Sequence, residues 1–344
     1  MYNKYNITVL GFFFLILLFP FLGIFNKINF DLEEIRVFLN NSYTQRIVFF
    51  SFYQAFLSAI ISCILAIPFA LALNRHKDHK LVRYIISLCG FSFVIPSILI
   101  VFSVIKIFGY NGILNTYFNF YDLFSIKSIY GLKAILIAHV LLNTPFATRL
   151  FVQNLNTIPR NYYEISESIN LNFLGNIFKL EIPIIKQSLF AVFSIIFSLC
   201  FLSFAIVMAL GGSPKNSTLE VAIFQYALFD LNFNKAIILS FIQIFICITF
   251  VLIGFYNFKG SNFFEVGAIK FKHPHKNKKL IQYIDYFLIL FFIIVLFSPI
   301  FVIYNEFLKS IFLKANLTST FIHAFKNSLL ISLLTGLIIS IFGL

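Results

Sequence analysis

Long, uninterrupted apolar stretches dominate the pattern of this chain. A helix needs about 20 apolar residues to cross the hydrocarbon core of a bilayer, and about eight segments reach that length. They lie near residues 6–26, 47–74, 84–108, 132–155, 184–210, 235–257, 283–308 and 321–344. The runs are continuous and lack the alternation of a membrane β-strand. The pattern therefore predicts an all-α polytopic membrane protein.

Composition supports this fold class. Of the 344 residues, 60% are hydrophobic and only 11% are charged, which excludes a soluble domain of average usage. The first apolar run follows a single basic residue, Lys4, and no small-residue cleavage site follows that run. We therefore expect a retained anchor rather than a removed signal peptide.

The basic residues predict an orientation. Lysines and arginines concentrate in the segments 75–83, 159–183 and 258–280, and the alternate loops hold fewer of them. Because basic loops remain on the cytoplasmic side, the N-terminus and the 159–183 loop are expected to be cytoplasmic. The net charge of +13 then reflects topology and contact with anionic lipid rather than nucleic-acid binding.

A polar, lysine-rich linker at 258–280 divides the chain. Residues 1–257 would form one half with six spans, and residues 281–344 would begin a second, incomplete half. His273 and His275 lie in this linker, where the lysine density favours a solvated connector over a metal site. A weak internal echo supports the division. It pairs Ser51, Ala55, Ser58 and Ala59 with Ser328, Ser332, Thr335 and Gly336.

The segment 159–183 is the most informative polar stretch. Glu164 begins a short amphipathic segment, Asn170 interrupts it, Phe178 lies on a second segment, and Pro183 restarts the chain as it re-enters the membrane. A polar segment between two spans must lie outside the lipid. The pattern predicts two short helices joined by a turn on the cytoplasmic face, either as a docking element or as an ordinary interhelical loop.

Polar residues also occur inside the predicted spans. Gln54 lies on the second span, and His139, Asn143 and Thr144 lie close together on the fourth, followed by Pro145. Polar groups at that depth are costly unless they are paired or hydrated. They predict either a translocation path or hydrogen bonds between helices.

The chain carries no motif for catalysis. The phosphate-loop pattern GxxxxGK[ST] and the HExxH and GxSxG patterns are absent from the sequence, and its four cysteines show no metal-ligand spacing. We expect neither a catalytic residue, a cofactor nor a metal ion.

The 159–183 segment resembles the cytoplasmic loop of permease subunits in bacterial binding-protein-dependent ABC importers. Glu164, Ser166, Ile182 and Pro183 fit the family pattern at its spacing. The resemblance implies a type I transmembrane domain whose loop engages an ATPase dimer. The implied coupling residues are Glu164, Ile165, Ser166, Asn170, Phe178, Glu181, Ile182 and Pro183.

Two positions depart from the family pattern. Ile165 replaces the first small residue, and Asn170 stands where the family has glycine. Asparagine tolerates positive φ better than most residues. We therefore expect Asn170 to preserve the turn.

Three further segments, at 51–62, 138–150 and 210–225, resemble those of thiamine transporter permeases. The resemblance implies import of thiamine or thiamine phosphates across the inner membrane by alternating access. It also implies a periplasmic substrate-binding protein, a second permease half and a surrounding lipid bilayer. The implied contacts with the binding protein are Gly211, Gly212, Thr218 and Glu220, although a structural turn would also explain these residues.

Alternative functions remain open at this point. An iron(III) importer permease has a similar architecture. An ATP-independent secondary transporter would need an ionisable pair within the membrane, where His139 is the deep titratable residue that the sequence offers. A membrane-embedded enzyme is disfavoured because the spans contain no paired carboxylates or metal-ligand cluster.

Overall fold

The computed structural model describes residues 32–123, 128–212, 214–256, 278–312 and 319–342, together with residues 11, 14, 15, 18, 19 and 23. The elements are α2 (Leu32–Leu39), α3 (Ser42–Arg75), α4 (Lys80–Leu88), the 3-10 turn η1 (Cys89–Phe93), α5 (Ser97–Phe108), α6 (Ile113–Phe118), α7 (Phe120–Leu123), α8 (Leu132–Leu155), α9 (Arg160–Ser168), α10 (Phe173–Asn176), the π-helical turn η2 (Ile177–Glu181), α11 (Ile182–Phe201), α12 (Ala205–Leu210), α13 (Leu219–Leu228), α14 (Phe233–Tyr256), α15 (Lys279–Phe312) and α16 (Ser319–Phe342). The chain divides into two compact units, Met1–Pro299 and Ile300–Leu344.

Seven helical segments in the described ranges are long and apolar enough to cross a membrane. They correspond to the predicted spans other than the first and confirm an all-α polytopic fold. The predicted span over 132–155 coincides with α8. Most of the predicted first span, and the linker up to residue 277, lie outside the described residues.

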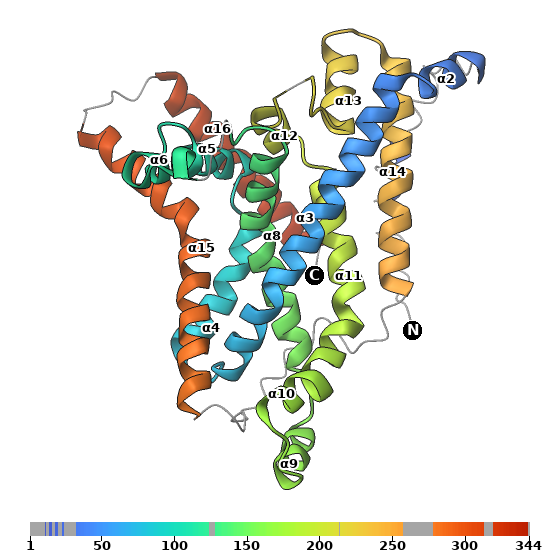
Figure 1. Cartoon of the computed structure of the whole chain (residues 1–344). Coiled ribbons are helices and arrows are strands. Elements are labelled where there is room, and N and C mark those ends of the chain that lie inside the picture. The colour runs from blue at the N-terminus through green and yellow to red at the C-terminus, as the bar shows by residue number, and fades with distance from the viewer. Residues whose placement is uncertain are drawn as a thin grey trace. The chain divides into compact units, whose positions relative to one another are not determined.

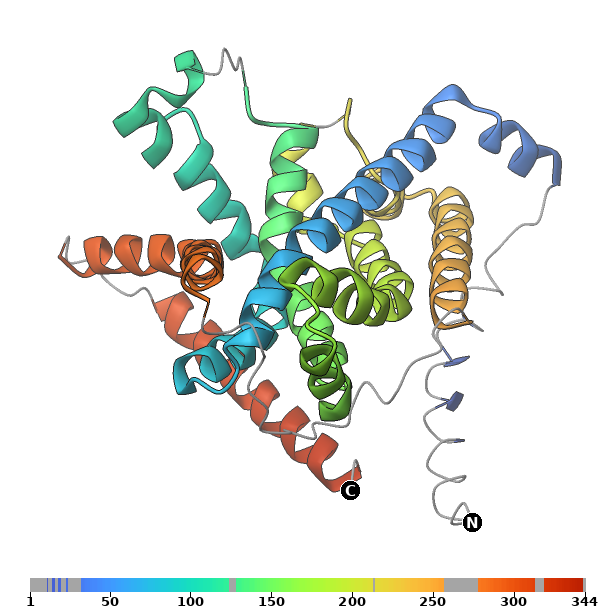
Figure 2. The ribbon, with the colours of Figure 1, turned by 60° about the horizontal axis from the view of Figure 1, so that its bottom comes forward.

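Helix α3 lies at the centre of the first unit and packs against α8 and α11 (Figures 1 and 2). Its contacting face is built from small side chains. Ala55, Ser58, Ala59 and Ser62 are all completely buried. Small residues let helix backbones approach closely where lipid supplies no hydrophobic driving force between helices. The small residues of this span therefore have a packing role in the first unit.

Aromatic rings join α3 to α11 and α14. The ring of Phe197 on α11 stacks on Phe250 of α14 with centroids 4.0 Å apart, and Phe52 of α3 meets the same ring edge-on at 5.4 Å. Offset and edge-to-face pairs add to the packing of buried apolar area. This cluster links α3, α11 and α14.

The predicted span over 84–108 is interrupted, which corrects the sequence interpretation. The structure has α4, the turn η1 and then α5, which begins at Ser97 after Pro96. Proline has no backbone N–H and disfavours helical geometry in the residue before it. Hydropathy remains high through this break, so the apolar pattern alone does not reveal it.

The predicted span over 184–210 is also interrupted. Helix α11 ends at Phe201 and α12 begins at Ala205, and the residues between them include neither glycine nor proline. The sequence interpretation also missed α13, because its residues were taken as the continuation of an outer turn. The local sequence pattern reveals neither the break after α11 nor the helix α13.

The basic segments gather at one end of the first unit. Lys77 Nζ, after α3, donates to Asn156 Oδ1 after α8 at 2.7 Å. Arg75 at the end of α3 reaches Asp285 near the start of α15 at 2.6 Å. This proximity confirms that the loops following α3 and α8 share one end with the start of α15.

The second unit contains the last part of α15 and α16. Every side chain of α16 that the structure describes is exposed, including Phe321, Leu330 and Ile339. The counterparts proposed for the echo, Ser328 and Ser332, are exposed as well. An apolar helix with such a surface requires lipid or another helix around it.

Candidate functional site

The segment 159–183 forms a protruding end of the first unit, where α9 and α10 extend beyond α3 and α8 (Figure 1). Pro159 precedes α9, and the Asn172 side chain caps α10 by accepting the Gly175 N–H at 2.7 Å. The π-helical turn η2 then leads directly into α11, which has Pro183 in its first turn. The predicted first short helix and the turn after it are confirmed, whereas the second helix is not a separate one, because α10, η2 and α11 run on from Phe173 to Phe201.

The turn after α9 has the geometry expected for Asn170. Its φ is 52°, in the left-handed region that asparagine tolerates. The Asn170 N–H donates to Glu167 O at 2.9 Å, and the Leu171 N–H donates to Ser166 O at 2.8 Å. These two bonds form the Schellman arrangement that satisfies the last carbonyls of a helix.

The predicted coupling residues divide into two groups. Glu164, Ile165, Asn170, Phe178 and Pro183 are exposed on the protruding end. Ser166 and Glu181 are buried, and Ile182 is half-buried. The exposed group can contact another protein, whereas the buried group can only hold the loop in place.

Apolar side chains are prominent on this exposed surface. Ile165, Ile169, Leu174 and Phe178 are between 58% and 66% exposed. Exposed apolar residues that gather on a surface mark a site of interaction. We call these four residues the apolar tip.

A buried ion cluster holds the base of the loop. Arg75 Nη2 lies 2.6 Å from Asp285 Oδ1, and Arg75 Nε donates to Asp285 Oδ2 at 2.9 Å. His76 Nε2 approaches the same Oδ2 at 3.1 Å. Two parallel N–H···O bonds from one guanidinium are the strongest geometry for an arginine–carboxylate pair.

The same arginine faces the loop. Its Nη1 lies 3.9 Å from Glu181 Oε2, and its guanidinium lies 5.2 Å from the centre of the Phe173 ring. The Tyr163 hydroxyl donates to Glu181 Oε1 at 3.4 Å. Burial, followed by the adjacent Glu181 carboxylate, raises the pKa of Tyr163 above its usual range, so its phenol remains a donor. Arg75 thus contacts α10, the π-helical turn and α15 together.

Sequence reasoning missed this cluster. Arg75 was counted only as a loop charge that sets topology, whereas its side chain is 4% exposed and paired. Asp285 was not singled out. An acidic residue within an apolar span is itself a signal of a buried partner, and that signal was present in the sequence.

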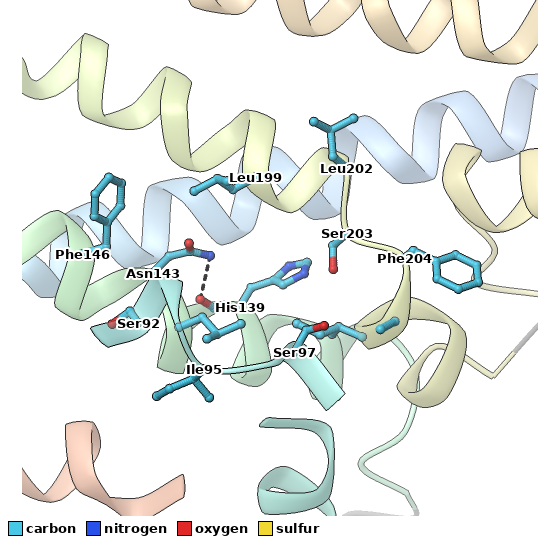
Figure 3. A pocket seen from close by; sticks show the side chains of 13 residues that line it. Ser92, Ile95, Ser97, His139, Asn143, Phe146, Leu199, Leu202, Ser203 and Phe204 are labelled. Atoms are coloured by element: carbon cyan, nitrogen blue, oxygen red, sulfur yellow. Dashed lines mark hydrogen bonds between the residues drawn. The ribbon is translucent and has the colours of Figure 1, made fainter. Parts of the chain in front are cut away.

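A pocket of about 470 Å³ lies beside α8 at the break between α11 and α12 (Figure 3). His139 and Asn143 of α8 line it, together with Ser203 from the break. Of the other predicted path residues, Gln54 and Thr144 are buried but do not line this pocket. The structure therefore brings together two of the four residues.

Gln54, the predicted path residue on α3, forms a hydrogen bond to another helix. Gln54 Nε2 donates to Cys200 O at 3.0 Å and to Ser51 O at 3.2 Å. Hydrogen bonding between helices is the alternative to a translocation path that the sequence predicted for this residue. Gln54 links α3 to the end of α11 just before the break.

The predicted outer contact segment is only partly accessible. Gly212 has a φ of 68°, which fits a tight turn. Thr218 is completely buried, and Glu220 accepts a hydrogen bond from Gln243 at 2.8 Å. The Leu219 N–H at the start of α13 donates to Ser51 Oγ at 2.8 Å. The expectation that Thr218 faces outward does not fit this burial.

Curated relatives of the chain are transport permeases. The thiamine transport system permease protein ThiP of Haemophilus influenzae is 34% identical over 266 residues, which cover 77% of this chain and 49% of that protein. ThiP of Escherichia coli is 36% identical over 214 residues, or 62% of this chain and 40% of the relative. The chain is a homologue of these permeases. It spans about half the length of the H. influenzae relative.

Solved structures show the same fold. A bacterial ABC transporter involved in the import of the acidic polysaccharide alginate superposes with a TM-score of 0.58 at 12% identity, covering 74% of this chain and 94% of the other. A bacterial alginate ABC transporter in complex with a periplasmic protein bound to an alginate pentasaccharide gives a TM-score of 0.57 at 13% identity, covering 73% and 92%. This chain thus has the transmembrane fold of an ABC transporter. No protein-family model matches the chain.

The ion cluster predicts a large stability effect for Asp285→Asn. The substitution leaves the Arg75 guanidinium with Glu181, 3.9 Å away, as its remaining counter-charge, so we expect a cost of up to about 3 kcal/mol, the low end for breaking a buried pair. We expect a clear fall in the thermal unfolding midpoint of the purified protein in detergent. Glu306→Gln is the control because Glu306, also on α15, forms an exposed pair with Lys309. Equal shifts in the two variants would contradict the proposed importance of burial.

The positive φ of Asn170 predicts that glycine is tolerated at this position and that valine is not. Asn170→Gly should leave the turn unchanged, because glycine adopts left-handed geometry without steric cost. Asn170→Val should strain the turn by about 1–3 kcal/mol. The measurement is the rate of limited trypsin cleavage at Arg160 and Lys179. If the valine variant carries about 1.4 kcal/mol of strain, this cleavage should become about tenfold faster. Faster cleavage of the glycine variant would show that the turn depends on the asparagine side chain.

Proposed function

We propose that this chain belongs to the permease subunit of an ATP-driven importer that moves thiamine or thiamine phosphates across the bacterial inner membrane. The homology to ThiP proteins carries this proposal. Seven curated relatives with 31% to 36% identity have thiamine transport names. These names favour thiamine over the iron(III) alternative. The transport subunit would perform no chemistry itself, and a partner ATPase would hydrolyse ATP.

The protruding loop supports a coupling role. The exposed Glu164 and the apolar tip would contact the ATPase dimer on the cytoplasmic side. The π-helical turn joins the loop to α11 without an intervening coil. Movement of the loop would therefore shift α11, which ends beside the pocket at the α11–α12 break.

The ion cluster would stiffen this connection. Arg75 contacts both the loop and α15. A buried pair with bidentate geometry resists separation because each charge would be left in a poorly solvating environment. Closure of the ATPase dimer would then act on α3, α11 and α15 as a connected group, which suits alternating access between two discrete states.

Other features of the chain extend this proposal. The outer segment with Gly211, Gly212 and Glu220 would lie on the periplasmic side, near a substrate-binding protein. The alginate transporter solved with a periplasmic protein supports a partner of that kind. Residues 1–257 would form the first permease half and residues 281–344 the beginning of a second. The N-terminus would be cytoplasmic.

An ATP-independent secondary transporter is the alternative from another class. It would need a buried ionisable pair on the substrate path. The described ion pairs with buried side chains lie at the end of α3, next to the loop, rather than in the pocket. This placement favours a structural role for the charges and an external energy source for transport.

The decisive experiment is reconstitution. The full-length gene product would be purified with its ATPase and incorporated into liposomes with thiamine-loaded binding protein. We expect ATP-dependent uptake of labelled thiamine and stimulated ATP hydrolysis, with no competition by iron(III). Uptake without ATP would favour a secondary transporter, and stimulation by iron(III) instead of thiamine would favour the iron importer.

The loop assignment predicts that Glu164→Lys abolishes stimulation of the ATPase while leaving membrane insertion intact. Glu164 pairs with Arg160 at the exposed end of α9, and a lysine there would place two cations one helical turn apart. Glu34→Lys is the matched control, since Glu34 is exposed on α2 before the opposite end of α3. Normal stimulation in the Glu164→Lys protein would remove the coupling assignment.

A further inference from the structure

His139 presents an unused nitrogen in the pocket. Its side chain is 2% exposed, and Nε2 has no hydrogen-bond partner within the described structure. Figure 3 shows the imidazole ring extending from α8 towards Ser203 at the break after α11. A buried polar nitrogen without a partner carries a desolvation penalty, so such an atom at a pocket marks a place for a ligand group.

The neighbours of His139 decide which nitrogen carries the proton. Ser58 Oγ lies 2.7 Å from Gln54 O and 3.1 Å from His139 Nδ1. The serine hydroxyl has one proton, and it donates this proton to the carbonyl oxygen of Gln54, the shorter of the two contacts. Ser58 Oγ can therefore only accept at Nδ1, which places the imidazole proton on Nδ1. The neutral ring then offers an unprotonated Nε2, a hydrogen-bond acceptor, to the pocket.

The nearby amide does not satisfy that acceptor. Asn143 Nδ2 donates to His139 O at 2.9 Å and to Cys200 Sγ at 3.2 Å. Both of its protons are thus directed at other atoms. Within the described structure no group donates to His139 Nε2, so a donor group on a bound molecule would complete the site.

The other walls restrict the ligand further. Phe146, Leu142 and Phe204 contribute apolar surface, and none of the thirteen described lining residues carries a carboxylate or an ammonium group. A volume of about 470 Å³ falls within the range of about 300–1,000 Å³ typical of small-molecule sites. The pocket suits a flat, mostly apolar ring system with one N–H donor, selected by a directional hydrogen bond rather than by an ion pair.

We propose that the pocket is a specificity site in which His139 Nε2 accepts a hydrogen bond from the exocyclic amino group of an aminopyrimidine ring. This inference rests on the proposed thiamine function, because thiamine carries such a ring. The ring of Phe146, two turns along α8 from His139, would accommodate the cationic thiazolium by cation–π contact. His139 is a specificity-determining residue, and Ser58 is a positioning residue that fixes its tautomer.

Uptake of thiamine and of its analogue with hydrogen in place of the amino group tests the proposal. The reconstituted wild-type transporter should prefer thiamine by about tenfold or more, since a missing donor leaves the buried acceptor unpaired. His139→Phe should import both compounds at a similar, reduced rate. Thr148→Val, a loss of a buried hydroxyl on the same helix, is the control and should retain the preference.

The outcomes separate this inference from the proposed function. No thiamine uptake by the wild-type transporter would overturn the function, and with it the ligand. Thiamine uptake whose preference survives in His139→Phe would overturn the specificity site alone. A structural role of His139 would lower both uptake rates without changing their ratio.

A second readout tests the tautomer without any substrate. In membranes containing protein with ¹⁵N-labelled histidine, solid-state NMR should show His139 protonated at Nδ1 and unprotonated at Nε2. Ser58→Ala should alter this tautomer preference. A protonated Nε2 in the wild-type protein would overturn the assignment of an acceptor.

Discussion

The bidentate ion pair between Arg75 and Asp285 is the interaction on which the arrangement of the first unit depends. The two residues are separated by 210 positions in the chain, and both side chains are almost completely inaccessible to solvent. Placing one charge there alone would be costly, because neither lipid nor a packed interior solvates it well. The end of α3 and the start of α15 must therefore meet, and Glu181 brings the base of the loop to the same place.

Helix breaks create the pocket where a continuous helix would leave none. Leu202 and Ser203 line it at the end of α11, and Ser97 contributes from the start of α5 after another break. Irregular backbone at membrane depth is tolerated only where protein or a cavity surrounds it. The two departures from the predicted spans thus lie at the same cavity, next to His139 and Asn143 on the uninterrupted helix α8.

The exposed and buried parts of the 159–183 segment have different requirements. The apolar tip depends on the Schellman turn at Asn170, which is local and involves residues within six positions of one another. The base depends on Arg75, which is remote in sequence. The local hydrogen bonds therefore fix the shape of the loop, and the contacts of Arg75 fix its position relative to α3 and α15.

The sequence by itself determined the spans of α3, α8 and α14, the short helix and the turn that begin the 159–183 loop, and the positive φ of Asn170. These features depend on transfer of apolar side chains from water and on local backbone preferences, which a sequence expresses directly. Only the tertiary structure decided the break at residues 202–204, the burial of Arg75 and Thr218, and the free acceptor of His139. Those features depend on which distant groups become neighbours, because a buried charge or imidazole takes its role from its hydrogen-bond partners.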